Sequence, residues 1–573
     1  MATKKNPTNL EYLVIKAKKF IQSNELDLAS KLLKENQINF PNKSPLLNLL
    51  AQIALIKNNL KEGINLLKKS LQINQNQPLV AYDLGVALSL NNQLDEAIIF
   101  FNNSIALEPN NPKAYLTKAV NLKKLDRLND SIDCYQKIIE LSPNYIEAYV
   151  NKADLLELIG KLTEAQSLYQ QAIIIEPKNA DLYIKYGNFL DKIDQVDEAL
   201  YSYKKSIEIK PINPGALINI GYIYKRLMKF DEALLYLKES VQIRDNHQGY
   251  NNIASIYCTL GNVMEGIAYY DKAIKCKPDT AESHIFKAYA HQSIKEIDKA
   301  ILSYDRGLQI DKDYKYAFGE RFHAKNIICD WDNYEKDYNW IESKLKENRF
   351  VSVPLSICGV FDDPLIQKKG AELYAKDLYP PNNSLGPIKK YPKNKKIKIG
   401  YFSGDFREHP VGHLVTEIFE MHDKSKFKLF AFSVSSRIKS RIRTRIEKSF
   451  DEFIDVSNFS DKKAASIARE KEIDIAIDLG GYTKNSRPAI LAMRAAPIQI
   501  NFLGYPGTTG ANYIDYNIVD KFIIPKELQQ HYSEKIIYLP KCYQPNEEKI
   551  IPGKKVFSRK SERLPDSGFI FCC

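Results

Sequence analysis

Small residues recur at a fixed interval among the apolar helical stretches in the first half of the chain. One series advances in steps of 34 residues, with a single step of 33: Ala17, Ala51, Gly85, Ala119, Ala153, Gly187, Gly221, Ala254 and Ala288. A second series follows it by twelve residues: Ala29, Gly63, Ala97, Ser131, Ala165, Ala199, Ala233, Gly266 and Ala300. Two small residues at this spacing allow the two helices of a hairpin to cross closely. The pattern therefore predicts a repeated helical hairpin, and four prolines at one phase mark where one hairpin ends and the next begins: Pro109, Pro143, Pro177 and Pro211.

This periodicity resembles the tetratricopeptide repeat family, with about nine copies over residues 9–314. The resemblance implies an α-solenoid, a right-handed superhelix whose concave groove holds extended peptides. In this family, one helix of each repeat lines the groove. Two positions before the first series, that helix carries Asp83, Thr117, Asn151, Lys185, Asn219 and Asn252.

Asparagine at that position resembles the asparagine ladder of O-linked N-acetylglucosamine transferases, whose amides hydrogen-bond a peptide main chain. The resemblance makes Asn151, Asn219 and Asn252 candidates for a peptide groove. Asparagine is common throughout this chain, so ordinary solvated helix positions are the alternative interpretation.

The 34-residue phase fades after residue 314, and the chain then reads as further helices followed by a linker rich in proline and lysine, LYPPNNSLGPIKKYPKNKK. The CDW motif at residues 329–331 resembles the connector of bacterial relatives of the transferase. We therefore expect three divisions: the repeats at 1–314, a helical connector and surface linker at 315–394, and a different domain at 395–573.

Short apolar runs alternate with helical ones from residue 396 onward. KIKIGYFS, FKLFAFSVS, FIDVS, IDIAIDL and IQINFLGY read as strands separated by helices, which predicts a parallel sheet with helices on both faces, a Rossmann-like layer. Ligands of such sheets bind in the loops beyond the carboxyl ends of the strands. Three of these loops are rich in glycine, at residues 403–413, 480–483 and 504–510.

The three loops, in this order, resemble the amino-terminal catalytic lobe of the O-linked N-acetylglucosamine transferase family. The resemblance continues through DYNIVD, HYSEKIIYLP and the YQPN of residues 543–546. It implies the GT-B fold, in which two Rossmann-like lobes hold a nucleotide sugar between them. The expected fold is thus an α-solenoid followed by an α/β Rossmann-like lobe of a GT-B glycosyltransferase.

The resemblance also assigns residues to the site. His409 matches the family histidine that lies close to acceptor and donor and was once proposed as general base; the alternative is a helix-entry residue before Pro410. His413, one helical turn further, is expected to pack or bond within its helix. The floor of the acceptor cleft would be formed by Gly480, Gly481, Tyr482, Thr483, Gly504, Tyr505, Pro506, Gly507 and Thr508. Tight structural turns explain part of this glycine pattern without a ligand.

Composition narrows the possible partners. The net charge of +12 comes from 82 basic and 70 acidic residues spread over the chain, and a solvated linker explains the lysine run better than nucleic-acid binding does. The eight cysteines are scattered without a CxxC pair, so neither a disulfide framework nor a zinc site is expected. Neither a signal peptide nor a long apolar span is present, which predicts a cytoplasmic protein.

Two functions follow as hypotheses. The first is a protein O-glycosyltransferase that transfers N-acetylglucosamine from UDP-N-acetylglucosamine, or a sugar from a fucose or glucose nucleotide, to serine or threonine of proteins held by the repeats. The resemblance implies no metal, because the family stabilises the departing diphosphate with a lysine and helix N-terminal amides. The second function is a repeat scaffold that binds peptides without chemistry.

The last residues, 564–573, resemble the opening strand of the second catalytic lobe. Because no sequence follows Cys573, we expect the second lobe and its donor-binding lysine to be missing. The same reasoning predicts that this chain binds acceptor but does not transfer sugar.

Overall fold

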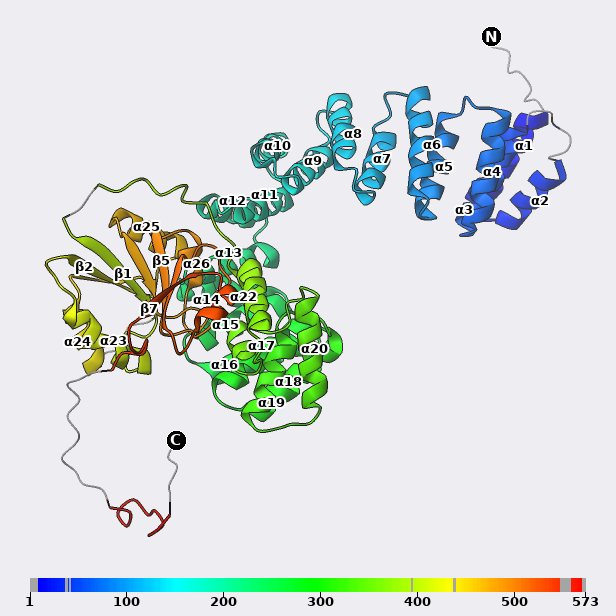
Figure 1. The fold of residues 1–573 in the computed structure, drawn as a ribbon. Coiled ribbons are helices and arrows are strands. Elements are labelled where there is room, and N and C mark those ends of the chain that lie inside the picture. The colour runs from blue at the N-terminus through cyan, green and yellow to red at the C-terminus, as the bar shows by residue number, and fades with distance from the viewer. Residues whose placement is uncertain are drawn as a thin grey trace. The chain divides into compact units, whose positions relative to one another are not determined.

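The computed structural model describes residues 9–36, 40, 43–392, 395–435, 440–546 and 558–568 (Figure 1). The chain divides into two units, Met1–Ala216 and Leu217–Cys573, and each is described by itself. The predicted continuous superhelix over residues 9–314 crosses this division and stays a prediction, as do the predicted divisions at residues 314 and 394.

The first unit consists of helical hairpins. Its helices are α1 (Asn9–Gln22), α2 (Leu26–Asn36), α3 (Ser44–Ile56), α4 (Leu60–Ile73), α5 (Pro78–Leu90), α6 (Leu94–Leu107), α7 (Pro112–Lys124), α8 (Leu128–Leu141), α9 (Ile146–Leu158), α10 (Leu162–Ile175), α11 (Ala180–Lys192) and α12 (Val196–Ile209). Each odd-numbered helix packs against the even-numbered helix that follows it. The predicted α-solenoid is confirmed.

The second unit begins with three more hairpins and continues through connector helices into the sheet. The hairpin helices are α13 (Pro214–Arg226), α14 (Phe230–Ile243), α15 (His247–Thr259), α16 (Val263–Cys276), α17 (Ala281–Ser293) and α18 (Ile297–Ile310). The connector consists of α19 (Ala317–Ile327), α20 (Tyr334–Lys346), α21 (Pro354–Cys358) and α22 (Pro364–Leu378).

The small residues of the first series lie beneath a bulky side chain from the partner helix. The bulky residue always stands sixteen positions later, and all nine are at most 4% exposed: Leu33, Leu67, Phe101, Tyr135, Tyr169, Tyr203, Leu237, Tyr270 and Tyr304. A Cβ atom at Gly187 would lie 2.6 Å from the ring of Tyr203, and one at Gly221 would lie 2.5 Å from Leu237. The hairpin crossing therefore requires a small residue under a large one.

The turn inside each hairpin also repeats. A residue in the left-handed conformation follows the first helix at intervals of 34 residues, with a single step of 33, and its φ lies between 59° and 87°: Asn24, Asn58, Asn92, Asp126, Gly160, Asp194, Met228, Gly261 and Lys295. Glycine, asparagine and aspartate tolerate this conformation best. Part of the asparagine content of the repeats thus serves the turns.

The sheet contains seven parallel strands in the order β3-β2-β1-β4-β5-β6-β7. They are β1 (Ile397–Ser403), β2 (Phe427–Ser433), β3 (Glu452–Asp455), β4 (Ile475–Asp478), β5 (Ile498–Phe502), β6 (Tyr516–Asp520) and β7 (Lys535–Leu539). The intervening helices are α23 (Pro410–Met421), α24 (Arg441–Ser449), α25 (Asp461–Glu470) and α26 (Pro488–Ala492), with a 3-10 turn η2 (Lys526–His531) before β7. The predicted parallel α/β lobe is confirmed.

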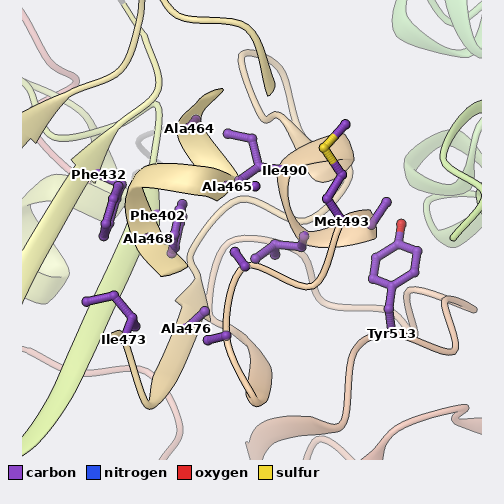
Figure 2. Packing of buried hydrophobic residues seen from close by; sticks show 14 of the residues in the cluster. Phe402, Phe432, Ala464, Ala465, Ala468, Ile473, Ala476, Ile490, Met493 and Tyr513 are labelled. Carbon is purple, nitrogen blue, oxygen red and sulfur yellow. The ribbon is translucent and has the colours of Figure 1, made fainter. Parts of the chain in front are cut away.

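Successive residues of a strand enter opposite cores. On β1, Phe402 joins the core under α25 and α26, and its ring stacks on Phe432 of β2 at 4.4 Å between centroids (Figure 2). The preceding Tyr401 joins the other core, where it meets Phe419 of α23 at 4.8 Å. Both faces of the sheet are therefore covered, as the continuous apolar strands predict.

The segment predicted as a surface linker makes hydrogen bonds to the sheet region. Arg469 of α25 donates hydrogen bonds to the carbonyl oxygens of Leu385 (3.0 Å) and Gly386 (2.8 Å). The N–H of Asn382 donates to the carbonyl oxygen of Ala492 at 2.8 Å. This part of the linker follows a fixed path because its backbone groups have partners.

The end of the chain was predicted to open a further strand. Residues 564–568 form bends rather than a strand, held by Arg559, which donates to the carbonyl oxygens of Pro565 and Gly568. Residues 569–573 lie outside the described residues.

We predict that Gly187→Leu destabilises the repeats, because the new side chain must displace Tyr203 from the hairpin crossing. Overpacking of this kind costs about 1 to 3 kcal/mol, which a thermal melt of the chain would show as a lower melting temperature. The matched control is Gly215→Ala, where the nearest atom to the new Cβ, Asn213 Oδ1, is 3.6 Å away. Equal melting temperatures for Gly187→Leu and the wild type would contradict the packing described here.

Candidate functional site

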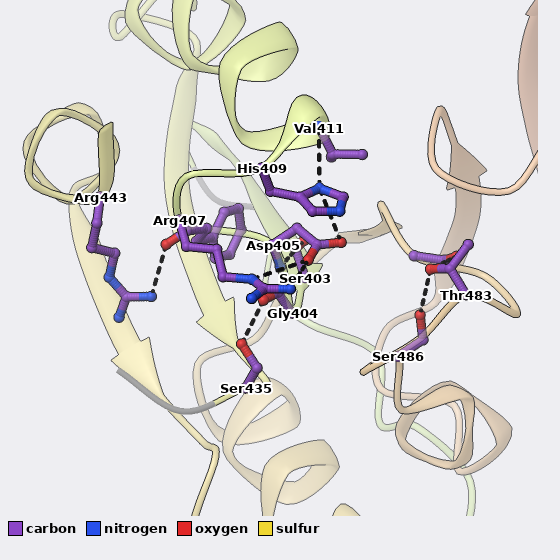
Figure 3. A network of polar contacts seen from close by, with 12 residues as sticks. Ser403, Gly404, Asp405, Arg407, His409, Val411, Ser435, Arg443, Thr483 and Ser486 are labelled. Carbon is purple, nitrogen blue, oxygen red and sulfur yellow. Dashed lines mark hydrogen bonds and ion pairs between the residues drawn. The ribbon is translucent and has the colours of Figure 1, made fainter. Parts of the chain in front are cut away.

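The order of the strands reverses between β1 and β4. From β1 the chain proceeds to β2 and β3 on one side, and from β4 it proceeds to β5, β6 and β7 on the other. The loops that leave these two neighbouring strands therefore diverge at the carboxyl edge, which is where open parallel sheets bind their ligands. Figure 3 shows the polar residues of both loops.

The loop after β1 is held by its own polar groups. Ser403, the last residue of β1, accepts a hydrogen bond from the N–H of Asp405 at 2.9 Å. The carboxylate of Asp405 is 5% exposed and lies 3.1 Å from Nη2 of Arg407. Arg443 of α24 donates to the carbonyl oxygen of Phe406 at 3.1 Å. These bonds fix the backbone that leads to His409.

His409 is the N-cap of α23, and its ring lies between two groups of opposite polarity. Nδ1 accepts from the N–H of Val411 at 3.3 Å and lies 3.5 Å from Oδ2 of Asp405 (Figure 3). An unprotonated Nδ1 can accept the hydrogen bond from the N–H of Val411, whereas a protonated Nδ1 can interact favourably with the carboxylate of Asp405. The side chain is 35% exposed, and Nε2 makes no hydrogen bond to the described residues. His409 can therefore offer Nε2 to a ligand in either protonation state.

His413 lies one turn further along α23 and is more exposed. Its Nε2 is 3.0 Å from Oε2 of Glu408, and its side chain is 56% exposed. The structure thus gives His413 a local partner at the start of the helix.

The loop after β4 is organised by a buried carboxylate that sequence reasoning missed. Asp478, the last residue of β4, accepts from the N–H groups of Gly480 at 3.0 Å and Gly481 at 3.1 Å. Burial raises the pKa of Asp478 to about 6, while the two N–H groups oppose this increase. Thr483 donates to the carbonyl oxygen of Gly480 at 2.8 Å, and its hydroxyl lies 3.1 Å from that of Ser486.

Tyr482 joins this loop to the connector and to the loop after β5. Its hydroxyl donates to the carbonyl oxygen of Thr509 at 2.7 Å. Its ring meets Tyr374 of α22 at 5.0 Å and Tyr505 at 5.4 Å, both edge to face. The predicted loops at 480–483 and 504–508 are therefore brought together, with α22 as a third partner.

The residues of the loop after β5 have internal partners. A Cβ at Gly504 would lie 2.0 Å from the carbonyl oxygen of Leu479, so the two loops touch through their backbones there. Tyr505 is buried with its hydroxyl 3.6 Å from Sγ of Cys358 in α21. Gly507 also packs against Cys358.

Two further residues of this loop differ in exposure. Thr508 is buried and donates to Glu534 at 2.7 Å, whereas Pro506 is exposed. Packing thus accounts for most of this loop, and its role as an acceptor wall stays a prediction.

The groove candidates fall in both units. Asn151 is half-buried on α9 of the first unit. Asn219 of α13 and Asn252 of α15 line one cavity of about 260 Å³ in the second unit, together with Lys225 and Glu282. The structure therefore brings Asn219 and Asn252 to a common pocket.

The described residues contain no group of three or more histidine, cysteine, aspartate or glutamate side chains that could hold a metal ion. The expectation that the reaction needs no metal stays a prediction. In the same part of the chain, no helix combines the length and the apolar character that crossing a membrane requires.

Comparison with known families shows which families the sheet region and the repeats resemble. Residues 328–552 match the family described as Glycosyl transferase family 41. We refer to residues 328–552 as the family 41 region after this match. Residues 80–111 and 112–145 match the tetratricopeptide repeat, and residues 149–265 match the middle TPR-like domain of cilia and flagella-associated protein 70. The resemblance to the O-linked N-acetylglucosamine transferase family is confirmed.

Individual relatives carry names of the same kind. The chain is 34% identical over 272 residues to the probable UDP-N-acetylglucosamine–peptide N-acetylglucosaminyltransferase SEC of Arabidopsis thaliana, covering 44% of this chain and 28% of the relative. It is 32% identical over 244 residues to the UDP-N-acetylglucosamine–peptide N-acetylglucosaminyltransferase of Caenorhabditis elegans, covering 38% of this chain and 20% of the relative. The chain thus spans about a quarter of the length of these relatives.

A solved O-GlcNAc transferase from Thermobaculum terrenum is 21% identical, with a TM-score of 0.41. The match covers 62% of this chain and 64% of that one.

We predict that Asp478 makes the stability of the family 41 region depend on pH. Its pKa is raised in the folded state, so its stabilising effect is complete below its unfolded pKa of about 3.8 and is lost as the pH rises through about 6. From pH 4 to pH 7, the unfolding free energy of the wild type should fall relative to Asp478→Asn by up to about 3 kcal/mol.

Urea denaturation of both proteins across this range measures the difference. Between pH 7 and pH 8 the offset between the two proteins should stay constant, which serves as the internal control. A constant offset from pH 4 to pH 7 would show that the pKa of Asp478 is not raised.

Proposed function

We propose that this chain provides the peptide-binding repeats and the acceptor side of a protein O-glycosyltransferase. The enzyme transfers N-acetylglucosamine from UDP-N-acetylglucosamine to serine or threonine hydroxyls. The observation that carries the proposal is the placement of His409 at the strand reversal of a family 41 region, with Nε2 unbonded and Asp405 behind Nδ1. A fucose or glucose nucleotide is the alternative donor.

The reaction needs a group that takes up a proton. As the acceptor oxygen bonds to the anomeric carbon, the bond from that carbon to the diphosphate breaks and the hydroxyl proton leaves. Nε2 of His409 can accept this proton when Nδ1 carries its own proton, and the imidazolium that forms then faces the carboxylate of Asp405. When Nδ1 instead accepts from Val411, Nε2 carries the proton and His409 donates a hydrogen bond to the bound sugar or acceptor.

The remaining parts of the proposal follow the family resemblance. The loops at 480–483 and 504–508 form the acceptor floor, in which Pro506 is exposed and Tyr482, Thr483 and Gly504 are half-buried. The departing diphosphate is stabilised by a lysine and helix N-terminal amides rather than a metal. The protein works in the cytoplasm on proteins held by Asn151, Asn219 and Asn252.

A peptide-binding scaffold without chemistry is the second candidate. It is favoured by the polar cavity of the second unit, which can bind an extended chain whether or not sugar transfer occurs. The two candidates differ in whether replacing His409 has any effect on a measurable reaction.

We predict that His409→Ala lowers sugar transfer about a hundred- to ten-thousandfold, the usual contribution of a positioned acid or base, without changing acceptor affinity. The assay measures radiolabelled N-acetylglucosamine incorporated into a protein acceptor. It uses the 573-residue chain and a version extended by the second lobe of a full-length relative.

The control is acceptor affinity of the same variant by calorimetry. Acceptor binding without incorporation by either version would favour the scaffold. The expectation that the 573-residue chain binds acceptor without transferring sugar stays a prediction, which the first arm of this assay tests.

We also predict that chelation leaves transfer unchanged, because the proposed chemistry uses protein groups in place of a cation. Incorporation by the extended version is measured with and without excess EDTA. The control adds magnesium back after chelation. A loss of activity that magnesium restores would show that a metal takes part.

A further inference from the structure

Glu320 is a buried carboxyl group in the connector, away from the candidate site. It lies on α19 and is 9% exposed, and its Oε1 accepts a hydrogen bond from the hydroxyl of Ser356 on α21 at 2.9 Å. Among the described residues, no cation forms an ion pair with it. Burial raises the pKa of Glu320 to about 7, and the bond from Ser356 opposes this increase. A buried carboxylate without a cation is unfavourable, so this position favours the neutral acid.

Tyrosine side chains face Glu320 from three other helices. They are Tyr289 of α17, Tyr304 of α18 and Tyr374 of α22. Burial chiefly raises the pKa of all three tyrosines, and the negative charge of Glu320 adds to this effect. The last repeat hairpin and the connector therefore meet around a carboxyl group whose neighbours do not neutralise its charge.

The cations on α19 itself have partners other than Glu320. Arg321 and Lys325 lie one and five residues after it, and burial lowers the pKa of His323. The partners are Asp305 of α18 and Asp337 of α20 for Arg321, and Asp330 and the carbonyl oxygen of Asp332 for Lys325. These contacts leave the ionised form of Glu320 dependent on water.

The helix that binds Glu320 also contacts the loop after β5. Helix α21 has only five residues and carries Ser356 near its middle and Cys358 at its end. Sγ of Cys358 lies 3.6 Å from the hydroxyl of Tyr505, and Gly507 packs against the same sulfur atom. A helix this short has few hydrogen bonds of its own, so its position depends on such side-chain contacts.

We propose that Glu320 is a proton-dependent latch that holds α21 against the loop after β5. In its neutral form, Glu320 packs beneath α21 and accepts from Ser356, so Cys358 stays beside Tyr505. In its ionised form, the carboxylate gains from contact with water, and α21 moves away to admit it. The effect of the latch on an acceptor rests on the proposed function, in which this loop is part of the acceptor floor, whereas the latch itself does not.

The closed position of α21 should be favoured in acid. The stabilising effect of Glu320 is complete below the ordinary glutamate pKa of about 4.3 and is lost as the pH rises through about 7. Opening should therefore increase from pH 5 to pH 7 and become constant above that range.

The experiment measures how fast a pyridyl disulfide reagent labels Cys358 in the full chain between pH 5 and pH 8, using peptide mass spectrometry. The wild type is compared with Glu320→Gln, whose amide oxygen can accept from Ser356 but whose side chain cannot ionise. The titrations of the thiol and of Asp478 are common to both proteins and cancel in the ratio of the two rates. Cys276, which is exposed on α16, is the internal control.

The ratio of the wild-type rate to the Glu320→Gln rate at Cys358 should rise about three- to tenfold from pH 5 to pH 7 and then stay level. The rise is limited because Cys358 is half-buried and also reacts slowly in the closed form. Ser356→Ala removes a donor that favours the charged form, so the rise should continue to higher pH. The matched control is Glu335→Gln, which replaces an exposed glutamate of α20 and should behave as the wild type.

Two outcomes overturn the latch. The first is a ratio at Cys358 that does not change with pH. The second is a ratio that rises equally at Cys358 and Cys276, because the whole unit would then be opening rather than α21. No acceptor is present in this assay, so its failure is distinguishable from failure of the proposed function.

Discussion

The reversal of strand order between β1 and β4, in a sheet buried on both faces, governs where polar groups can stand in the family 41 region. Helices cover both faces, so the buried side chains inside β1 and β4 are apolar, and the first buried polar residues of these two strands come at their ends. Ser403 ends β1 and Asp478 ends β4, and each accepts hydrogen bonds from the loop that follows it. The residues at the ends of β1 and β4, where the strand order reverses, therefore hold in place the two loops that leave these strands.

The connector helices take part in this arrangement. Tyr374 of α22 packs on Tyr482, and Cys358 of α21 lies against Tyr505, so the loops after β4 and β5 are fixed from outside the sheet. Glu534, before β7, accepts from Thr508 and ties the second of these loops to the next strand. A loop with this many internal partners has little freedom to adjust to a ligand. Adaptability is therefore left to the rim of the site and to the repeats.

Sequence periodicity was sufficient to predict the hairpins and the parallel sheet, because both depend on local patterns of small and apolar residues. The bulky residue sixteen positions after each small one, such as Tyr203 after Gly187, recurs with the same period, so the sequence contained the signal for this contact as well. The site was predicted only as loops. Tyr374 and Cys358, the connector partners of Tyr482 and Tyr505, lie more than a hundred residues away along the chain, and an isolated acid such as Asp478 has no local signature. The contact between the linker and Arg469 could not be predicted either, because Arg469 lies more than eighty residues further along the chain.

Equivalent groove positions in a periodic fold need not have equivalent chemistry. Asn219 and Asn252 occupy the same position of successive repeats, and Oδ1 of Asn252 accepts a hydrogen bond from Nζ of Lys225. In a solenoid each hairpin packs only against its neighbours, so a residue such as Lys225 changes the cavity beside it while leaving the crossing of Gly221 and Leu237 in its own hairpin unaltered. The small residues at the hairpin crossings and the polar residues that line this cavity are therefore different sets. A polar residue of the cavity can be exchanged without repacking the crossing of its hairpin, because the two sets do not overlap.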